Sequence, residues 1–585
     1  MNHKFVYSLF LSLLLSLSIH SFGQDKVGEI HLKIIQTTDV HGAILPFDYI
    51  KNIDVDHSLA SAITYIKNER ENLNQSVILL DNGDILQGQP LVYYSNFEEP
   101  DSLHICASAM NYMKYDAATI GNHDIEAGHG VYDKLVKEFD FPWLAANAVH
   151  KKTGIPYFKP YSIIEKQGIR IAILGLITPA IPKWLPENIW AGIEFEDMLE
   201  SAKKWSEFIL KNEKPDILVG LFHSGVDYTY SNETDTTFKN ENASKLIAEK
   251  IPGFDVVFAG HDHEKRNETV LNSSGSEVLL LNASNGVYML AVADIYLKFD
   301  NQTQAYIKSK KGFLVETKKY ADDSLFVRYL NPYHQKVNSY VNRIIGENKK
   351  TISARESLFG NSDFIDFIHQ IQMEISGARI SFAAPLNYDF EIKQGPISVR
   401  DMFKLYRFEN LLYSMSLTGQ EIKDFLEFSA GLWFNQMKSE NDPLLKYHKN
   451  EKGRIMLDNP FYNFSSAGGI TYTVDVSKPV GQRIQIISFV NGDKFKLNKK
   501  YKVAINSYTG NGGGGHLTNG AGISKEQLSK RIVFSTEKDL RYYMMKYIEK
   551  KAVINPVKTN NWKIIPEEWW KIAKEKDYKL LFPSN

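Results

Sequence analysis

The first half of the sequence alternates short apolar runs with amphipathic stretches, and this alternation constrains the fold more than any other feature. Helical patterns cover Ser58–Asn72 and Phe195–Glu213. Runs typical of β-strands cover residues 31–39, 76–84, 117–122, 169–177, 216–224, 255–263 and 277–284. Strands that alternate with helices are typical of layered α/β domains. We therefore expect an α/β domain in this half of the chain.

Side chains that can bind metal ions stand at the ends of five of these strand-like runs. They are Asp39 and His41 in TTDVH, Asp84 in DNGD, Asn122 and His123 in GNHD, His223 in LFHS, and His261 and His263 in GHDH. In α/β sheets, ligands gather beyond the carboxyl ends of the strands. One histidine near a strand end is usually structural, but five such segments in one domain predict a metal centre.

The types of ligand indicate which metals this centre takes. A carboxylate between two cations can bridge them, and Asp84 is the natural bridge. Imidazole, amide and carboxylate together suit zinc, manganese, iron or cobalt, and they argue against calcium. Two divalent ions roughly 3.5–4 Å apart can clamp a phosphoryl group and supply a hydroxide at neutral pH. We therefore predict two divalent metal ions as cofactors.

The chain has 585 residues, which is long enough for at least two domains. A charged helical segment, 323–350, is predicted to connect a first domain, 24–322, to a second, 351–585. The pattern of helices and strands restarts after Ser353, and two later strands follow, so we expect a second domain of α+β architecture. Its expected helices cover 363–376, 399–405 and 419–431, and its expected strands cover 380–384, 410–417, 470–477 and 500–508.

The N-terminal residues 1–23 have the pattern of a secretory signal peptide. Lys4 precedes a mostly apolar run, and small or polar residues follow it. The alternative is an N-terminal membrane anchor, but the run is short for a span. We expect an exported protein, periplasmic or secreted. The single cysteine, Cys106, excludes an intramolecular disulfide, so packed cores must stabilise the chain.

The formal net charge of −1 does not indicate a nucleic-acid polymer as partner. Two aromatic segments of the second domain could instead bind a single base, because stacking on aromatic rings contributes about 1–3 kcal/mol per base. One segment holds Tyr462 and Phe464, and either could face a base. The other holds Tyr508 beside a glycine run, where backbone can approach a ligand closely. The alternative is that all three are ordinary strand aromatics.

The order D-x-H, GD, GNH, H and GHxH resembles that of the calcineurin-like metallophosphoesterases. The chain as a whole resembles the exported two-domain 5′-nucleotidase and 2′,3′-cyclic-nucleotide phosphodiesterase family. This resemblance implies a β-sandwich flanked by helices, followed by an α+β nucleotide-binding domain. It also implies two metal sites that share Asp84: the first is completed by Asp39, His41 and His263, and the second by Asn122, His223 and His261.

The same resemblance gives His123 a catalytic role beside the scissile phosphate, where it stabilises the transition state or the leaving oxygen. Glu126, three residues further on, would orient His123, although the family's 5′-nucleotidases carry the shorter aspartate there. Asp124 is left out of the metal ligands. The aromatic pair of the second domain would sandwich the base, so Tyr508 and one of Tyr462 and Phe464 are the candidates.

Two departures from the 5′-nucleotidase branch favour the 2′,3′-cyclic phosphodiesterase/3′-nucleotidase branch. The loop 386–395 contains no arginine, and Gly514 stands where that branch has an aspartate. We expect a monomeric nucleotide scavenger that opens 2′,3′-cyclic nucleotides and then dephosphorylates the 3′-nucleotide. The alternatives are a 5′-nucleotidase or UDP-sugar hydrolase, and a non-catalytic nucleotide-binding surface protein.

Overall fold

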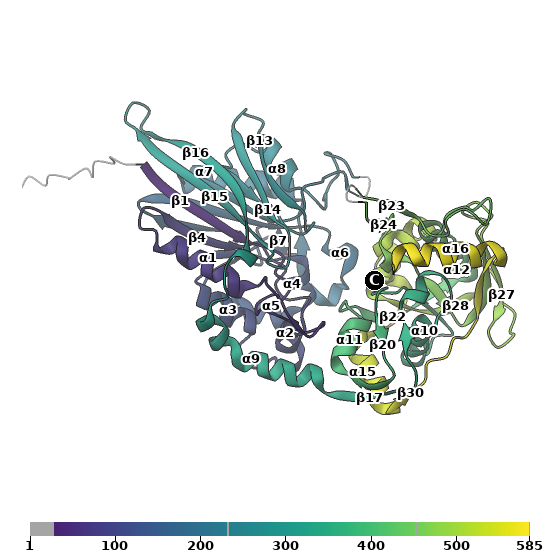
Figure 1. Ribbon diagram of the computed structural model, residues 1–585. Helices are drawn as coiled ribbons and strands as arrows, with labels where there is room; N and C mark the ends of the chain where they lie inside the picture. Colours follow the sequence, from purple (N-terminus) through teal and green to yellow (C-terminus); the bar gives the residue numbers. More distant parts are fainter. Residues whose placement is uncertain (1–28, 231–232, 451–452, 584–585) are drawn as a thin grey trace, which may run out of the picture.

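The computed structural model describes residues 29–230, 233–450 and 453–583, so the predicted signal peptide, 1–23, lies outside the described residues. Figure 1 shows two bodies, an N-terminal domain in purple to teal and a C-terminal domain in green to yellow. The long helix α9 (Ser324–Asn342) runs along the first body towards the second. Within the described ranges, every helix is too short or too polar to cross a membrane.

Two six-stranded sheets form the centre of the N-terminal domain. The first has the order β16 (Ala305–Glu316), β15 (Met289–Asp300), β1 (Glu29–Thr37), β4 (Ser76–Asp81), β5 (Ala117–Thr119) and β6 (Trp143–Leu144). The second has the order β13 (Lys265–Leu271), β14 (Glu277–Ala283), β12 (Val256–Phe258), β11 (Ile217–His223), β9 (Ile169–Ile177) and β8 (Tyr161–Lys166). Residues such as Ile34, Ile173 and Val219 pack between the sheets and are fully buried. The predicted β-sandwich is therefore confirmed.

Helices cover both outer faces of this sandwich. The helices α1 (Leu59–Glu71), α3 (Ile105–Met113) and α5 (His129–Glu138) share an apolar cluster with the first sheet. The helices α7 (Met198–Asn212) and α8 (Ser244–Lys250) share another with the second sheet. Central strands are thus buried on both faces, which explains why they are continuous apolar runs in the sequence.

Parallel pairing brings the ends of the central strands to one edge. β1, β4 and β5 are parallel neighbours in the first sheet, and β9, β11 and β12 are parallel neighbours in the second. Two buried amides join the sheets at this edge: Gln36 donates to the Ala259 carbonyl at 2.8 Å and Asn82 to the Phe222 carbonyl at 2.9 Å. The loops that follow these strands therefore meet.

The helix α9 is packed against the N-terminal domain. Its buried residues Phe326, Leu330, Val337 and Val341 belong to the same apolar cluster as α1 and α3. The helix ends at Asn342, and Ile344–Asn348 then forms β17, which pairs with β21 (Gly395–Ser398). The predicted connector segment is thus helical in its first part and a strand afterwards.

The C-terminal domain has a five-stranded mixed sheet with the order β25 (Ser466–Gly468), β19 (Ile380–Ala383), β28 (Lys500–Asn506), β22 (Leu411–Thr418) and β29 (Ile532–Asp539). The helices α10 (Asp363–Ser376) and α12 (Gly419–Trp433) pack on the sheet, and their apolar residues fall into two separate clusters. This confirms the predicted α+β domain. Smaller elements used below are α2 (Pro90–Tyr93), α4 (Asn122–Glu126), α6 (Ile181–Trp184), α13 (Ser507–Gly510) and α15 (Leu540–Lys551).

Candidate active site

The predicted metal ligands lie in the loops that follow β1, β4 and β12, at the end of β11, and at the start of α4, which follows β5. Five of them adopt positive φ angles: Asp39 at 49°, His41 at 48°, Asp84 at 59°, His261 at 73° and His263 at 59°. This left-handed conformation is costly for non-glycine residues, and such strain gathers at functional sites. The backbone of these loops is therefore strained, and this conformation directs the side chains to one place.

One group of ligand atoms comes from Asp39, His41 and His263. Their candidate ligand atoms all lie within 4.8 Å of one another. The Nε2 atoms of His41 and His263 are 3.0 Å apart, and His263 Nε2 is 3.3 Å from Asp39 Oδ1. This spacing between electron-rich atoms is what a shared cation would require.

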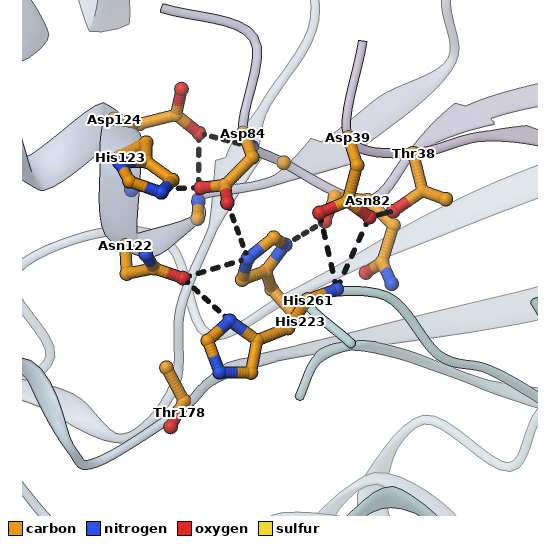
Figure 2. Close-up of polar contacts among 12 residues, drawn as sticks. Thr38, Asp39, Asn82, Asp84, Asn122, His123, Asp124, Thr178, His223 and His261 are labelled. Atoms are coloured by element: carbon orange, nitrogen blue, oxygen red, sulfur yellow. Dashed lines mark hydrogen bonds and ion pairs between the residues drawn. The ribbon is translucent and has the colours of Figure 1, made fainter. Parts of the chain in front are cut away.

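A second group comes from Asp84, His223 and His261, whose ligand atoms also lie within 4.8 Å of one another. His223 Nε2 is 3.1 Å from Asp84 Oδ2. Asn122 Oδ1 is 3.1 Å from His223 Nε2 and 2.8 Å from His261 Nδ1, so the amide oxygen faces both rings (Figure 2). The glycine before Asn122 is needed here, because a Cβ on Gly121 would lie 2.2 Å from Asp84 Oδ1.

In two of the histidines, a hydrogen bond at the outward nitrogen, the ring nitrogen that points away from the grouped ligand atoms, fixes the orientation of the ring. His41 donates through Nδ1 to the Gln87 carbonyl at 3.1 Å, and His223 donates through Nδ1 to the Asn82 carbonyl at 2.6 Å. A neutral ring that donates through Nδ1 carries its lone pair on Nε2, the atom that would face a cation. Burial lowers the pKa of His41 to about 4, against the opposing charge of Asp84, so this imidazole is neutral. The residues present fit two divalent cations.

Asp124 supports the centre without facing it. Its carboxylate is fully buried and accepts hydrogen bonds from the backbone N–H groups of Asp84, Ile85, Leu86 and Gly121 at 2.7–3.1 Å. One side chain thus holds both the β4 and the β5 loops in place. Its exclusion from the ligands agrees with this arrangement.

His123 and Glu126 face each other across one turn of α4. His123 Nδ1 lies 2.5 Å from Glu126 Oε2, and the His123 backbone N–H donates to Asp84 Oδ1 at 2.8 Å. Burial disfavours the charged imidazole, but Asp84 and Glu126 outweigh it and raise the pKa of His123 to about 9. Glu126 contacts His123, although its side chain is one methylene longer than the aspartate that the family's 5′-nucleotidases carry at this position.

A cavity of about 260 Å³ lies between the two domains, beside this centre. Asn122, His123, Glu126 and His261 line it from the N-terminal domain, and Tyr462 and Tyr508 line it from the C-terminal domain. The two tyrosine rings are 6.1 Å apart and nearly perpendicular. One tyrosine from each predicted segment thus lines the same cavity, but the perpendicular rings do not form the parallel sandwich that the family resemblance implies.

Phe464, the other candidate in its segment, does not line the cavity. Its side chain has no exposed surface and stacks on Trp433 at 5.4 Å, inside the core of the C-terminal domain. A one-turn 3₁₀ helix over Phe461–Asn463 directs Tyr462 and Phe464 differently. Of the two alternatives, the structure places Tyr462 at the cavity.

Several cavity residues lack any motif that could have identified them in the sequence. Trp184 ends helix α6 and Glu241 lies in a loop of the N-terminal domain, and Phe408, Asn410 and Asn506 come from the C-terminal domain. The Trp184 and His261 rings are 5.5 Å apart, and Glu241 lies 3.4 Å from His261. Only their position in space relates them to the metal ligands.

Two family descriptions match this chain. Calcineurin-like phosphoesterase matches residues 32–265, and the 5′-nucleotidase C-terminal domain matches residues 343–519. The fold and the site therefore define a calcineurin-like phosphoesterase domain. The chain is an enzyme that joins this domain to a 5′-nucleotidase C-terminal domain.

Two relatives match nearly the whole chain. The trifunctional nucleotide phosphoesterase protein YfkN of Bacillus subtilis is 28% identical over 95% of this chain, which spans only 40% of that relative's length. A 2′,3′-cyclic-nucleotide 2′-phosphodiesterase/3′-nucleotidase of Haemophilus influenzae is 26% identical over 97% of this chain and 92% of the relative.

Solved structures show the same fold. A putative 5′-nucleotidase from Staphylococcus aureus superposes with a TM-score of 0.74 and 19% identity, covering 91% of this chain and 99% of that one. A 5′-nucleotidase precursor from Thermus thermophilus superposes with a TM-score of 0.60 and 20% identity, covering 92% and 100%. At such identities these likenesses concern the architecture of both domains and not the substrate.

Proposed function

We propose that the chain hydrolyses nucleotides, acting as a 2′,3′-cyclic-nucleotide 2′-phosphodiesterase with 3′-nucleotidase activity. One observation carries this proposal: His123 and Asn122 share a single cavity with Tyr462 and Tyr508. Phosphoester chemistry and aromatic surface for a base thus meet in one place. The relative from Haemophilus influenzae named above bears both activities in its name.

In the proposed mechanism, the tyrosines hold the base and the loops of the N-terminal domain orient the phosphate. Two divalent ions held by Asp39, His41, Asp84, Asn122, His223, His261 and His263 would polarise the phosphoryl group and lower the pKa of water. Because Glu126 occupies His123 Nδ1, the Nε2 atom of His123 is left to donate its proton to the leaving ribose oxygen.

The charge of the cavity supports a substrate with one phosphoryl group. The described residues that line it include the carboxylates Glu126 and Glu241 but no lysine or arginine. Without metal ions the wall is therefore negative. Each additional phosphate would need a cation of its own, so nucleoside di- and triphosphates are disfavoured compared with cyclic or 3′-monophosphates.

A 5′-nucleotidase is the second candidate, because relatives bearing that name also match: one from Vibrio cholerae is 26% identical over 68% of this chain. For either activity we propose an exported enzyme, in keeping with the signal-peptide pattern of residues 1–23. Nucleotides outside the cytoplasm would then be its substrates.

The test is a substrate panel measured with purified protein. We expect manganese- or zinc-dependent hydrolysis of 2′,3′-cAMP and 3′-AMP to exceed that of 5′-AMP, with loss of activity in a chelator and recovery when metal is returned. Preference for 5′-AMP would select the 5′-nucleotidase. No hydrolysis with any added metal would leave only a nucleotide-binding protein and contradict the proposal.

A further inference from the structure

We propose that Glu241 is a positioning residue that fixes the tautomer of the metal ligand His261 and strengthens one of the two metal sites. This inference rests on the proposed metal centre. Glu241 Oε1 lies 3.4 Å from His261 Nε2, while His261 Nδ1 faces Asn122 Oδ1 at 2.8 Å. An imidazole that donates from Nε2 keeps its lone pair on Nδ1, the side that faces the second group of ligands.

His261 differs from the other histidine ligands in the partner of its outward nitrogen. The outward nitrogens of His41 and His223 meet neutral backbone carbonyls, and that of His263 meets the side-chain amide of Asn285 at 3.1 Å. Among the described histidine ligands, His261 alone has a carboxylate at its outward nitrogen. A carboxylate that accepts the distal N–H makes the imidazole a stronger donor to a metal.

Hydrogen bonds at the Glu241 backbone hold this residue in place. The Glu241 carbonyl accepts hydrogen bonds from Ser224 Oγ at 2.8 Å and Thr178 Oγ1 at 3.0 Å. The Glu241 N–H donates to Glu233 Oε2 at 2.9 Å. Ser224 follows the ligand His223 directly, and Thr178 follows the end of β9, so Glu241 is fixed to the edge of the sheet that carries the ligands.

Both partners are shielded from water. The side chains of His261 and Glu241 are 13% and 12% exposed, and the Trp184 ring lies 5.5 Å from the His261 ring. Such a contact is electrostatically stronger than one in open water. Glu241 therefore acts through the His261 ring, whose Nδ1 faces the site formed with Asp84, Asn122 and His223.

The experiment measures metal binding and needs no substrate. The full chain is stripped with a chelator, and Mn²⁺ is titrated into wild type, Glu241→Ala and Glu241→Gln by calorimetry. We expect two binding events in wild type. Glu241→Ala should weaken one of them by about 10–100-fold and leave the other unchanged. Glu241→Gln keeps an acceptor oxygen without the charge, so its loss should be smaller, about 10-fold.

Glu264→Gln is the matched control, because Glu264 is an exposed carboxylate in the same loop as His261. It should leave both affinities unchanged. The inference is contradicted if Glu241→Gln and Glu241→Ala bind Mn²⁺ like wild type, or if both sites weaken equally. Should Glu241→Ala not fold, as judged by thermal unfolding in chelator, Glu241→Gln decides alone. A wild-type chain without Mn²⁺ binding would contradict the metal centre itself, which separates the two proposals.

Discussion

Tyr93 of the N-terminal domain donates its hydroxyl proton to Asp539 of the C-terminal domain over 2.9 Å. The tyrosine is 2% exposed and packs within the apolar cluster of the other domain. The Arg541 guanidinium lies 4.9 Å from its ring and 4.1 Å from that of Phe403. The N-terminal domain thus inserts the Tyr93 side chain into the C-terminal domain, and this contact joins the two domains between which the cavity lies.

We expect Tyr93→Phe to favour separation of the domains. The change removes the hydrogen bond to Asp539 and leaves the ring, at a cost of about 1–3 kcal/mol for the unpaired buried carboxylate oxygen. The ratio of molecules with separated domains to molecules with joined domains should rise by roughly 5–150-fold. Energy transfer between dyes on the two domains would report it. Tyr94→Phe is the control, since Tyr94 faces α9 through Tyr340; an equal effect there would refute a specific role for Tyr93.

Replacing His123 with alanine should lower turnover by roughly 10²–10⁴-fold while both metal ions stay bound. The reason is that His123 lines the cavity but contributes to neither group of ligand atoms. Glu126→Gln should have a smaller effect, because the imidazole stays in place without its charged partner. Rates and metal content are measured on the same samples. Unchanged turnover, or loss of metal, would show that the role assigned to His123 is wrong.

Asp124→Asn should destabilise the protein and weaken metal binding together. The carboxylate accepts four backbone N–H groups, two at each oxygen, and asparagine replaces one of these oxygens with an NH₂ group that cannot accept, so two of the four lose their acceptor. We expect a loss of about 3 kcal/mol in the free energy of unfolding, measured with urea. Asp140→Asn, at an exposed position, is the control. A variant as stable as wild type would mean that the loops hold their conformation without Asp124.

Replacing Tyr462 and replacing Phe464 should affect different quantities, substrate binding in the first case and protein stability in the second. Tyr462→Ala should raise KM for nucleotides by about tenfold or more, because stacking is worth about 1–3 kcal/mol per base. Hydrolysis of glycerol 2-phosphate, which has no base, should change little. Phe464→Ala should instead cost about 3–5 kcal/mol of stability and leave KM unchanged, because Phe464 is fully buried. The reverse result would place Phe464 at the base.

Acid should destabilise the C-terminal domain through His369. This histidine is buried between the hydroxyls of Ser381 and Ser466, at 3.0 Å and 3.1 Å, and burial lowers its pKa from 6.5 to about 3. The unfolded chain therefore binds one more proton between these values, and stability falls as the pH drops from 6.5 towards 3. The contribution is about 1.4 kcal/mol per pH unit.

The measurement compares the free energy of unfolding of wild type and His369→Gln at several pH values from about 4 to 7. The variant should lack this part of the slope. His448→Gln removes a histidine whose side chain is 60% exposed and should keep the wild-type slope. Parallel pH profiles for wild type and His369→Gln would contradict the prediction.

Much of the candidate metal centre could be predicted from the sequence, because its pattern is local. Asp39, Asp84 and Asn122 each follow an apolar strand within a few residues, and the parallel pairing that brings these strands together is itself implied by the alternation of strands and helices. The layered fold follows from the same periodicity. Asp124 could be set apart from the ligands by comparison with the family's motif, but its hold on two loops could not be anticipated.

Contacts between residues that no local pattern connects depend on the folded chain. Glu241 reaches His261 through a loop without any motif, Tyr93 meets Asp539 across 446 positions, and a single 3₁₀ turn sends Tyr462 to the cavity and Phe464 to the core. The apolar pattern of a strand can be recognised from residues that are neighbours in the sequence. These contacts instead arise from how two domains and several loops pack. The amino-acid order alone thus specifies which groups could do the chemistry, and packing determines which of them meet.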